Sequence, residues 1–271
     1  DGTTSSSPQL ITWITDRTAL TDTPIQVSTR WTYAYENYIT NTYAAWKSLN
    51  QNTPFAAGLG HLMKGSGKNY TAYDPGTQNY VFMGKPNNAD ITTPINDGFD
   101  ALIGNPYPSA IDANKFLEDN GPIGSNAISG ALYFWEHYLG NNTHVLRDYE
   151  GGYAVLNYVG GIAATTPPPT AEGYTIVGGI GLKVPERYIP VGQGFFVTAA
   201  QIKDLEGNAI SDGTGGDIVF NNNQRIFKRE AETGVGSNSG SVFFKSGNGK
   251  DKNNSASNNN PVDETDGIKR I

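Results

Sequence analysis

The stretch Trp31-Thr-Tyr-Ala-Tyr-Glu36 alternates aromatic side chains with smaller or polar ones. Successive side chains of an extended chain point to opposite faces, so the three aromatic residues would share one face of a strand. Aromatic and β-branched residues also favour strands over helices. This stretch therefore predicts a β-strand.

Working outward from it, short runs of the same kind recur along the chain, separated by turn-forming clusters such as Asp74-Pro75-Gly76, Asn96-Asp97-Gly98 and Gly151-Gly152. Many short strands separated by turns are typical of a sandwich or a barrel. We predict an all-β fold, a single jelly-roll-like β-sandwich over residues 10–245. The expected strands are Leu10–Ile14, Ile25–Tyr35, Tyr80–Met83, Ala131–Tyr138, Tyr153–Val159, Tyr174–Leu182, Gly194–Thr198, Asp217–Phe220 and Gly240–Phe244.

One short helix is expected inside this β-rich pattern. Ser109 stands three residues before Asp112, a short-armed variant of the capping box, and apolar residues follow at helical spacing. Asn120-Gly121-Pro122 would end the helix. A second short helical turn is expected within Tyr43–Leu49.

The two ends of the chain differ in composition from its middle. Residues 1–9 are polar and read as a leader or linker, and residues 246–267 contain almost no apolar side chains. A segment that buries so little apolar surface cannot offset the entropy of ordering, so we predict a disordered linker over 246–267. Residues 268–271 are typical of the start of a further strand, in a following domain.

Composition and charge exclude several classes of protein. The 271 residues include no cysteine, so disulfides and thiolate metal sites are excluded. The net charge of −7 disfavours binding to nucleic acid, whose phosphates are also negative. No apolar run approaches the roughly 18 residues of a membrane span, so no transmembrane segment is expected.

Six stretches occur in an order that resembles a known family. They are His61–Gly65, Tyr80–Asn88, Leu102–Asp112, Leu132–His137, Pro190–Val197 and Ile218–Arg225. Together they resemble a module of large secreted cell-surface proteins of Bacteroidota that the type IX secretion system exports. In that family the module precedes a C-terminal sorting domain. The resemblance implies an extracellular location and surface display, adhesion or a role beside gliding and polymer capture, and it implies no established catalytic residues.

The residues themselves also give little support to an enzyme. Glu136 and His137 could act as acid and base, but adjacent residues of a strand point to opposite faces. The chain contains neither a G-x-S-x-G nor an H-E-x-x-H motif. We therefore expect no enzymatic activity and no catalytic residue.

Several oxygen-rich loops could hold a structural calcium ion. Hard cations prefer carboxylates and carbonyl oxygens, but ordinary turn chemistry explains the same Asn-Asp-Gly clusters. The candidate ligands are Asp90, Asp97, Asp100, Asp212 and Asp217.

Aromatic residues are the most suggestive feature for ligand binding. Exposed Trp and Tyr side chains can stack on sugar rings, although most aromatic residues of a β-sandwich fill its core. Among the candidates, the three in predicted loops (Trp46, Tyr107 and Tyr149) are those expected to be exposed. The candidate ligand-binding residues are Trp46, Tyr107, Trp135 and Tyr149.

These observations predict a non-catalytic adhesion or glycan-contact module of a larger secreted protein. Its partner would be a surface polysaccharide or a neighbouring surface protein. One alternative is a structural stalk or filament subunit that contacts other copies of itself. A second alternative is an atypical glycan-active enzyme.

Overall fold

In a computed structural model of the chain, the described residues are 11–15, 26–35, 46–63, 82–137, 151–165, 181, 183–200, 206 and 216–228. They divide into two compact units. Residues 11–15, 26–31 and 82–84 belong to the first unit, and the other described residues belong to the second.

In the first unit, strand β1 (Thr12–Ile14) pairs in parallel with β2 (Gln26–Ser28), and the 3-10 turn η1 (Thr29–Trp31) follows. The Thr29 hydroxyl donates to the carbonyl oxygen of Ile14 at 3.3 Å. Arg30 Nε donates to the carbonyl oxygen of Thr15 at 2.7 Å. Both bonds join the turn to the end of β1. The 3-10 turn interrupts the strand predicted over Ile25–Tyr35, so placing Trp31 on a strand was wrong.

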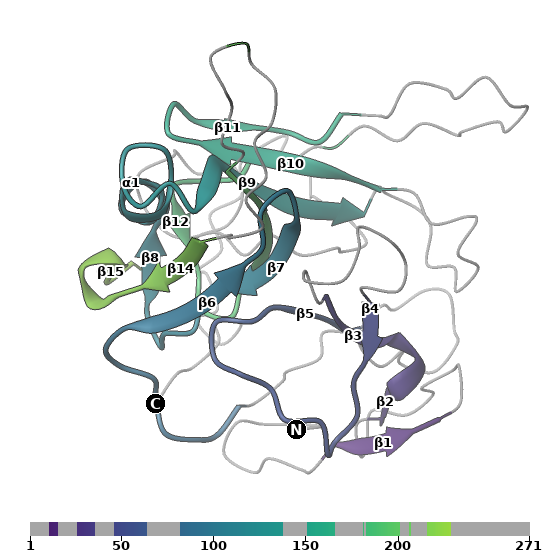
Figure 1. Cartoon of the computed structure of the whole chain (residues 1–271). Helices are drawn as coiled ribbons and strands as arrows, with labels where there is room; N and C mark the ends of the chain where they lie inside the picture. The colour runs from purple at the N-terminus through teal and green to yellow at the C-terminus, as the bar shows by residue number, and fades with distance from the viewer. Residues whose placement is uncertain are drawn as a thin grey trace, which may run out of the picture. The chain divides into compact units, whose positions relative to one another are not determined.

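The second unit is built on a five-stranded antiparallel sheet in the order β11-β10-β9-β13-β7 (Figure 1). Between Val197 and Ala199 of β13 the pairing with β9 shifts, from Leu132 to Ile128. Gly130 lies in that irregular stretch with φ of +90°, a backbone angle that side chains with a Cβ rarely adopt. The strands are β7 (Asp100–Gly104), β9 (Ile128–His137), β10 (Gly151–Asn157), β11 (Gly161–Ile162) and β13 (Gly194–Ala199).

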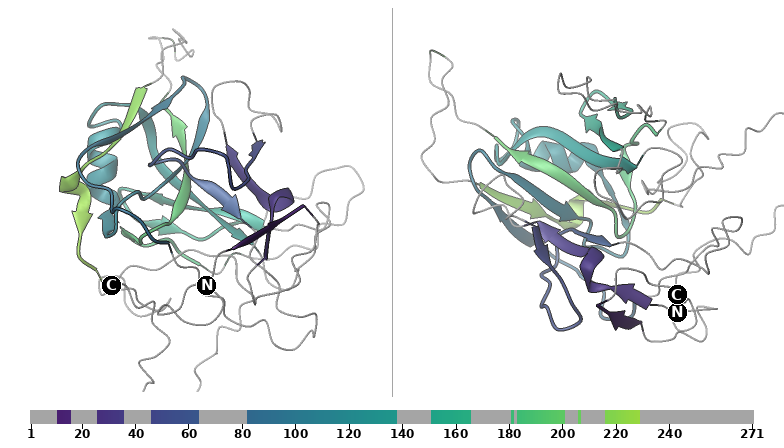
Figure 2. Two further views of the ribbon diagram at one scale, coloured as in Figure 1. Left: turned by 90° about the horizontal axis from the view of Figure 1, so that it is seen from below. Right: turned by 90° about the vertical axis from the view of Figure 1, so that its right-hand side faces the viewer.

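Three smaller antiparallel sheets complete this unit, in the orders β14-β6, β12-β8-β15 and β4-β3-β5. Figure 2 shows the ribbon from two further sides, coloured along the chain. A 3-10 turn, η4 (Asn222–Gln224), connects β14 to β15. The strands are β3 (Thr32–Tyr35), β4 (Trp46–Ser48), β5 (His61–Met63), β6 (Ile91–Ile95), β8 (Ala110–Asp112), β12 (Tyr188–Ile189), β14 (Gly216–Phe220) and β15 (Arg225–Ile226).

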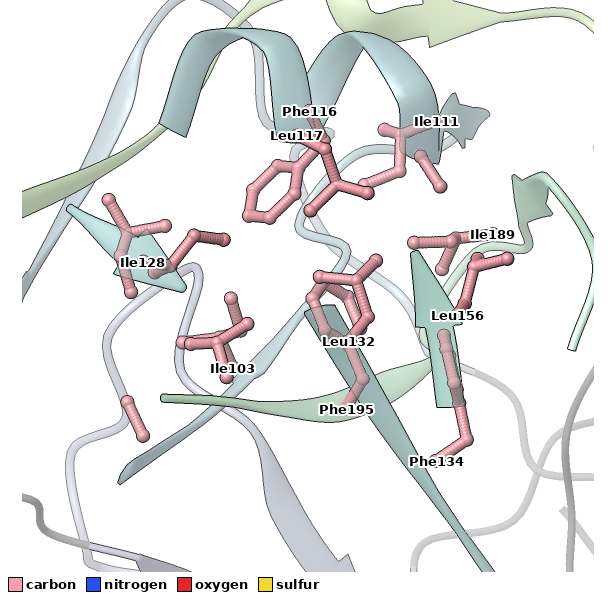
Figure 3. Close-up of a cluster of buried hydrophobic side chains, with 14 of the residues drawn as sticks. Ile103, Ile111, Phe116, Leu117, Ile128, Leu132, Phe134, Leu156, Ile189 and Phe195 are labelled. Atoms are coloured by element: carbon pink, nitrogen blue, oxygen red, sulfur yellow. The ribbon is translucent and has the colours of Figure 1, made fainter. Parts of the chain in front are cut away.

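The hydrophobic core lies between one face of the five-stranded sheet and a second layer made of helix α1 (Ala113–Asn120), β6, β8, β12 and β14. In Figure 3, Phe116 and Leu117 point from the helix toward Leu132 and Phe195 of the sheet. Every second residue of β13 is buried, which is the period-2 pattern of a strand with one face in the core. The core residues include Ile103, Ile111, Phe116, Leu117, Ile128, Leu132, Phe134, Leu156, Ile189, Phe195, Ile218 and Phe220.

The predicted helix is confirmed, but it begins later than the sequence pattern suggests. Asp112 is the N-cap, and its carboxylate accepts a hydrogen bond from the Asn114 backbone N–H. Ser109 is not the cap, because the residues between it and the helix form strand β8. Gly121 follows the last helical residue, as expected.

The all-β prediction is confirmed, whereas the jelly-roll arrangement is not. A jelly roll pairs two sheets of comparable size, and here the layer opposite the main sheet combines a helix with small sheets. The helical turn expected within Tyr43–Leu49 is wrong, because Trp46–Ser48 form strand β4 paired with β3. Gly151-Gly152 is not a turn either, because both residues lie in β10.

Parts of several predictions lie outside the described residues. They are the strand over Gly240–Phe244, nearly all of the strand over Tyr174–Leu182, the leader over 1–9 and the tail over 246–271. Phe82 and Met83 are described and do not form the predicted strand. No helix in the described part of the chain is long and apolar enough to cross a membrane.

Asn120, the last residue of α1, joins the helix to β14 from a fully buried position. Its side-chain amide donates to the carbonyl oxygens of Phe116 (2.9 Å) and Val219 (3.0 Å), and its Oδ1 accepts from the Val219 N–H (2.7 Å). We expect Asn120→Leu to lower the free energy of unfolding by about 1–3 kcal/mol, because the half-buried backbone N–H and C=O of Val219 lose their partners. Urea unfolding would measure it. Asn223→Ala, at an exposed position, is the control and should change stability by less than about 0.5 kcal/mol.

Candidate functional site: an aromatic face on the main sheet

The face of the five-stranded sheet that points away from the core carries aromatic side chains. On β13, Phe195 lies in the core, and its neighbour Phe196 is half-buried on the opposite face. On β9, Phe134 is likewise in the core while Trp135 is half-buried. Adjacent residues of a strand must point to opposite sides, so each pair of neighbouring aromatic residues supplies one ring to each face.

The rings on this outer face contact one another across three strands. Trp135 of β9 stands directly opposite Tyr153 of β10, with ring centroids 5.0 Å apart in an edge-to-face arrangement. Tyr153 also meets Phe196 of β13 at 5.7 Å. Because β9 lies between β10 and β13, the Tyr153 ring must lean over β9 to reach Phe196.

Two more rings come from the small sheet β4-β3-β5. Tyr35 of β3 and Trp46 of β4 are paired in register, with centroids 5.0 Å apart. Both rings also contact Phe196, at 5.3 Å and 6.0 Å. We call the five rings of Tyr35, Trp46, Trp135, Tyr153 and Phe196 the aromatic face.

This aromatic face is open to solvent in part. Tyr153 is 42% exposed, and the other four residues are half-buried. Edge-to-face contacts fix the rings relative to one another, and each such pair contributes about 0.5–1.5 kcal/mol beyond area burial. The rings therefore form a fixed amphipathic surface with little rotamer entropy left to lose on binding.

Gly151 explains how Trp135 fits against the sheet. A Cβ atom at Gly151 would collide with the six-membered ring of the Trp135 indole. The indole therefore covers the backbone at the start of β10, where only glycine leaves room for it.

Asp100 adds a negative charge beside the rings. It pairs with Thr198 across β7 and β13, and its Oδ1 accepts a hydrogen bond from the Thr198 hydroxyl at 2.7 Å. Thr198 lies two residues from Phe196, on the same face of β13. Burial, followed by the field of Asp100, raises the pKa of both Tyr35 and Tyr153, so both hydroxyls stay protonated at neutral pH.

The structure brings two of the four predicted ligand-binding residues together, namely Trp46 and Trp135. Trp46 was expected in an exposed loop, but it lies on β4 and is half-buried. Tyr149 lies outside the described residues.

The expectation that Tyr107 is exposed is wrong, because its side chain is only 1% exposed. Its hydroxyl donates to the carbonyl oxygen of Ala89 at 2.7 Å, and the Arg225 guanidinium lies 5.1 Å from the ring centroid. Burial, followed by the charge of Asp90, raises its pKa, and Arg225 opposes this in part. Tyr107 therefore anchors loops and cannot offer its ring to a ligand.

The candidate calcium ligands are spread over separate places. Asp90 is exposed and precedes β6. Asp97 lies in a turn in which the Phe99 N–H donates to the carbonyl oxygen of Asn96. Asp217 is exposed on β14 opposite Pro94, and Asp212 lies outside the described residues. Within the described ranges, no three His, Asp or Glu side chains gather where they could hold a metal ion.

The described carboxylates near the main sheet do not face one another. Glu136 is buried on the core side of β9, and its Oε2 accepts from the Lys183 N–H at 3.3 Å. Asp100 is on the opposite face of the same sheet, with the aromatic rings. These two acids therefore cannot act on one substrate as a catalytic pair.

Phe196, Tyr35 and Tyr153 were not selected from the sequence. Phe196 could have been found, because Phe195-Phe196 within a predicted strand requires one ring on each face. The approach of β3 and β4 to β13 has no sequence signal, since it joins residues 150 or more positions apart.

The fold and this surface define the class of protein: an all-β module with an acidic aromatic face on its main sheet. The chain belongs to the family described as "Domain of unknown function (DUF8693)", which it matches over residues 6–261. Comparison with curated proteins finds no match, and comparison with solved structures finds none either.

Proposed function

We propose that this chain is a non-catalytic glycan-binding module of a secreted bacterial surface protein, and that it binds sugars on the aromatic face. The observation that carries the proposal is the set of five touching rings, drawn from five strands, with Tyr153 at its exposed part. The resemblance to exported Bacteroidota surface modules and the low content of charged residues, 17%, support the extracellular location.

Sugar rings suit this surface for a physical reason. One side of a pyranose ring presents aliphatic C–H groups that stack on aromatic rings, while its hydroxyls need hydrogen-bond partners. The Trp135 and Tyr153 rings offer apolar area, and protonated tyrosine hydroxyls offer donors and acceptors. Preformed sites lined by aromatic residues with a few polar groups are the usual form of a small-ligand site.

A glycan array of the purified protein, run with calcium and with chelator, would identify a ligand. We then expect Tyr153→Ala to weaken binding to that ligand by roughly five- to thirtyfold, because stacking on one ring contributes about 1–2 kcal/mol. Isothermal titration calorimetry would measure the affinity.

Tyr158→Ala is the matched control. Tyr158 is 50% exposed, close to the exposure of Tyr153, but it lies past the end of β10, where its hydroxyl donates to Glu118 of α1 at 2.7 Å. We expect the control to bind as the wild type does. If the wild type and Tyr153→Ala bind the ligand with equal affinity, the proposal is refuted.

A structural role in protein–protein contacts is the second candidate. The hairpin that joins β10 to β11 exposes Val159 at its tip and Ile162 on the following strand, and Val184 beside it is exposed as well. Exposed apolar side chains that lie together favour contact with another protein. Sedimentation over a range of concentrations tests this role, since a monomer at all concentrations would exclude self-assembly.

A further inference from the structure

We infer that the aromatic face selects glycans whose sugars carry a free, protonated amino group over neutral or acetylated ones. This inference rests on the proposed function and names the chemistry of its ligand. It comes from the position and the pairing of Asp100.

Asp100 is placed at the aromatic face by the register of the main sheet. It stands opposite Thr198 of β13, so Phe196 is its diagonal neighbour on the same face. Diagonal neighbours in a sheet are about 7–8 Å apart at their backbones, within reach of aromatic side chains. Phe196 in turn touches Tyr35, Trp46 and Tyr153.

Within the described part of the chain, Asp100 has a hydrogen bond but no cationic partner. The Thr198 hydroxyl satisfies one lone pair of Oδ1, while a carboxylate has about four acceptor positions. The described ion pair, Arg187 with Asp112, lies in the opposite layer. The negative charge of Asp100 is therefore left for a ligand to neutralise.

The rings around Asp100 favour a cation for a second reason. The faces of Trp and Tyr rings carry partial negative charge and attract cations by about 0.5–2 kcal/mol each. A net charge of −7 adds a long-range field of the same sign. An acidic glycan would meet repulsion here, and a neutral one would gain from Asp100 a hydrogen bond from a hydroxyl but no charge attraction. A protonated amino sugar gains from both its ring and its charge.

The test compares three oligosaccharides of equal length: β-1,4-linked glucosamine, its N-acetylated counterpart and the corresponding glucose oligomer. Calorimetry at a slightly acidic pH and low salt would give the three affinities. We expect the wild type to bind the glucosamine oligomer about tenfold more tightly than the other two. A gain of this size is what one cation–π contact aided by a carboxylate provides.

Asp100→Asn removes the charge but keeps an oxygen that can accept from Thr198. We expect this variant to bind all three oligomers with the affinity that the wild type shows for the neutral ones. The matched control is Asp217→Asn, an exposed acid on β14, which should keep the tenfold preference. Should Asp100→Asn not fold, salt titration of the wild type decides: raising the ionic strength should weaken binding of the glucosamine oligomer alone.

The outcomes separate the inference from the proposed function. If the wild type binds all three oligomers equally well and Tyr153→Ala loses this binding, the charge preference is overturned and the glycan-binding role remains intact. A preference that persists in Asp100→Asn would overturn the role of Asp100. Binding of none of the oligomers, together with a blank glycan array, would overturn both proposals.

Discussion

Phe195→Ala should lower the free energy of unfolding by about 4 kcal/mol, the largest loss we expect from one substitution in this chain. Phe195 is 1% exposed and lies at the centre of the core. Its ring packs edge-to-face on Phe116 of α1 at 5.7 Å and against Phe134 of β9 at 5.6 Å. Truncation would remove these contacts and leave a cavity that the helix and the sheet cannot both move to fill. Urea unfolding followed by tryptophan fluorescence would measure the change.

Phe196→Ala is the control for Phe195→Ala, because it is the same substitution one residue along the same strand. Phe196 is half-buried on the outer face, where truncation leaves no closed cavity, so we expect a smaller loss of about 2 kcal/mol from the area and the three ring contacts removed. We also expect Phe196→Ala to lose glycan binding while it remains folded, because Phe196 belongs to the aromatic face. Equal loss of stability in the two variants would contradict the assignment of the two faces.

Arg187→Ala has the second largest expected effect on stability. It should lower the free energy of unfolding by about 2–3 kcal/mol. Arg187 Nε and Nη2 donate to the two carboxylate oxygens of Asp112 at 2.8 and 2.7 Å. The Asp112 side chain is 3% exposed, so removal of the guanidinium would leave a buried charge without its partner. The Arg187 side chain is 46% exposed, and water entering that space keeps the loss below the value for a fully buried pair.

Two further variants isolate the contribution of this ion pair. The Arg187 backbone carbonyl, which accepts from the Ala113 N–H at 2.8 Å, stays in place in every variant. Arg187→Lys keeps a charge but not the two-pronged geometry, so it should recover about half of the loss. The double variant Arg187→Ala with Asp112→Asn should be less destabilised than the sum of the single changes. Strict additivity of the two changes would show that they do not interact.

The sequence indicated that aromatic residues would form the candidate site, but it did not indicate which of them lie together. The abundance of Trp and Tyr predicts ligand contact by aromatic residues, and two of the four candidates, Trp46 and Trp135, lie in the aromatic face. Tyr107 was placed wrongly, because a residue in a predicted loop was expected to be exposed and its side chain is buried. In the structure Arg225, which follows Tyr107 by more than a hundred residues, packs on its ring, and no local sequence pattern predicts this contact.

The sequence by itself determined the all-β class, the short helix and its C-terminal end, and the presence of strands at β9, β10 and β13. These features depend on local rules: the two-residue period of a strand, and the turn chemistry of Gly and Asn. The start of the helix was displaced because a tertiary pairing, β8 with β12 and β15, takes the residues that a local capping rule would assign to it.

Only the tertiary structure decided which aromatic residues meet. Tyr35, Tyr153 and Phe196 come from three strands far apart in the chain, and their contact depends on the order and register of those strands. The same register places Asp100 beside Thr198 and gives the aromatic face its charge. Strand register depends on the packing of the whole core, because a shift by one residue would move every core side chain to the wrong face. A local pattern predicts that a strand has two faces, but the packing of the core determines which face remains available to a ligand.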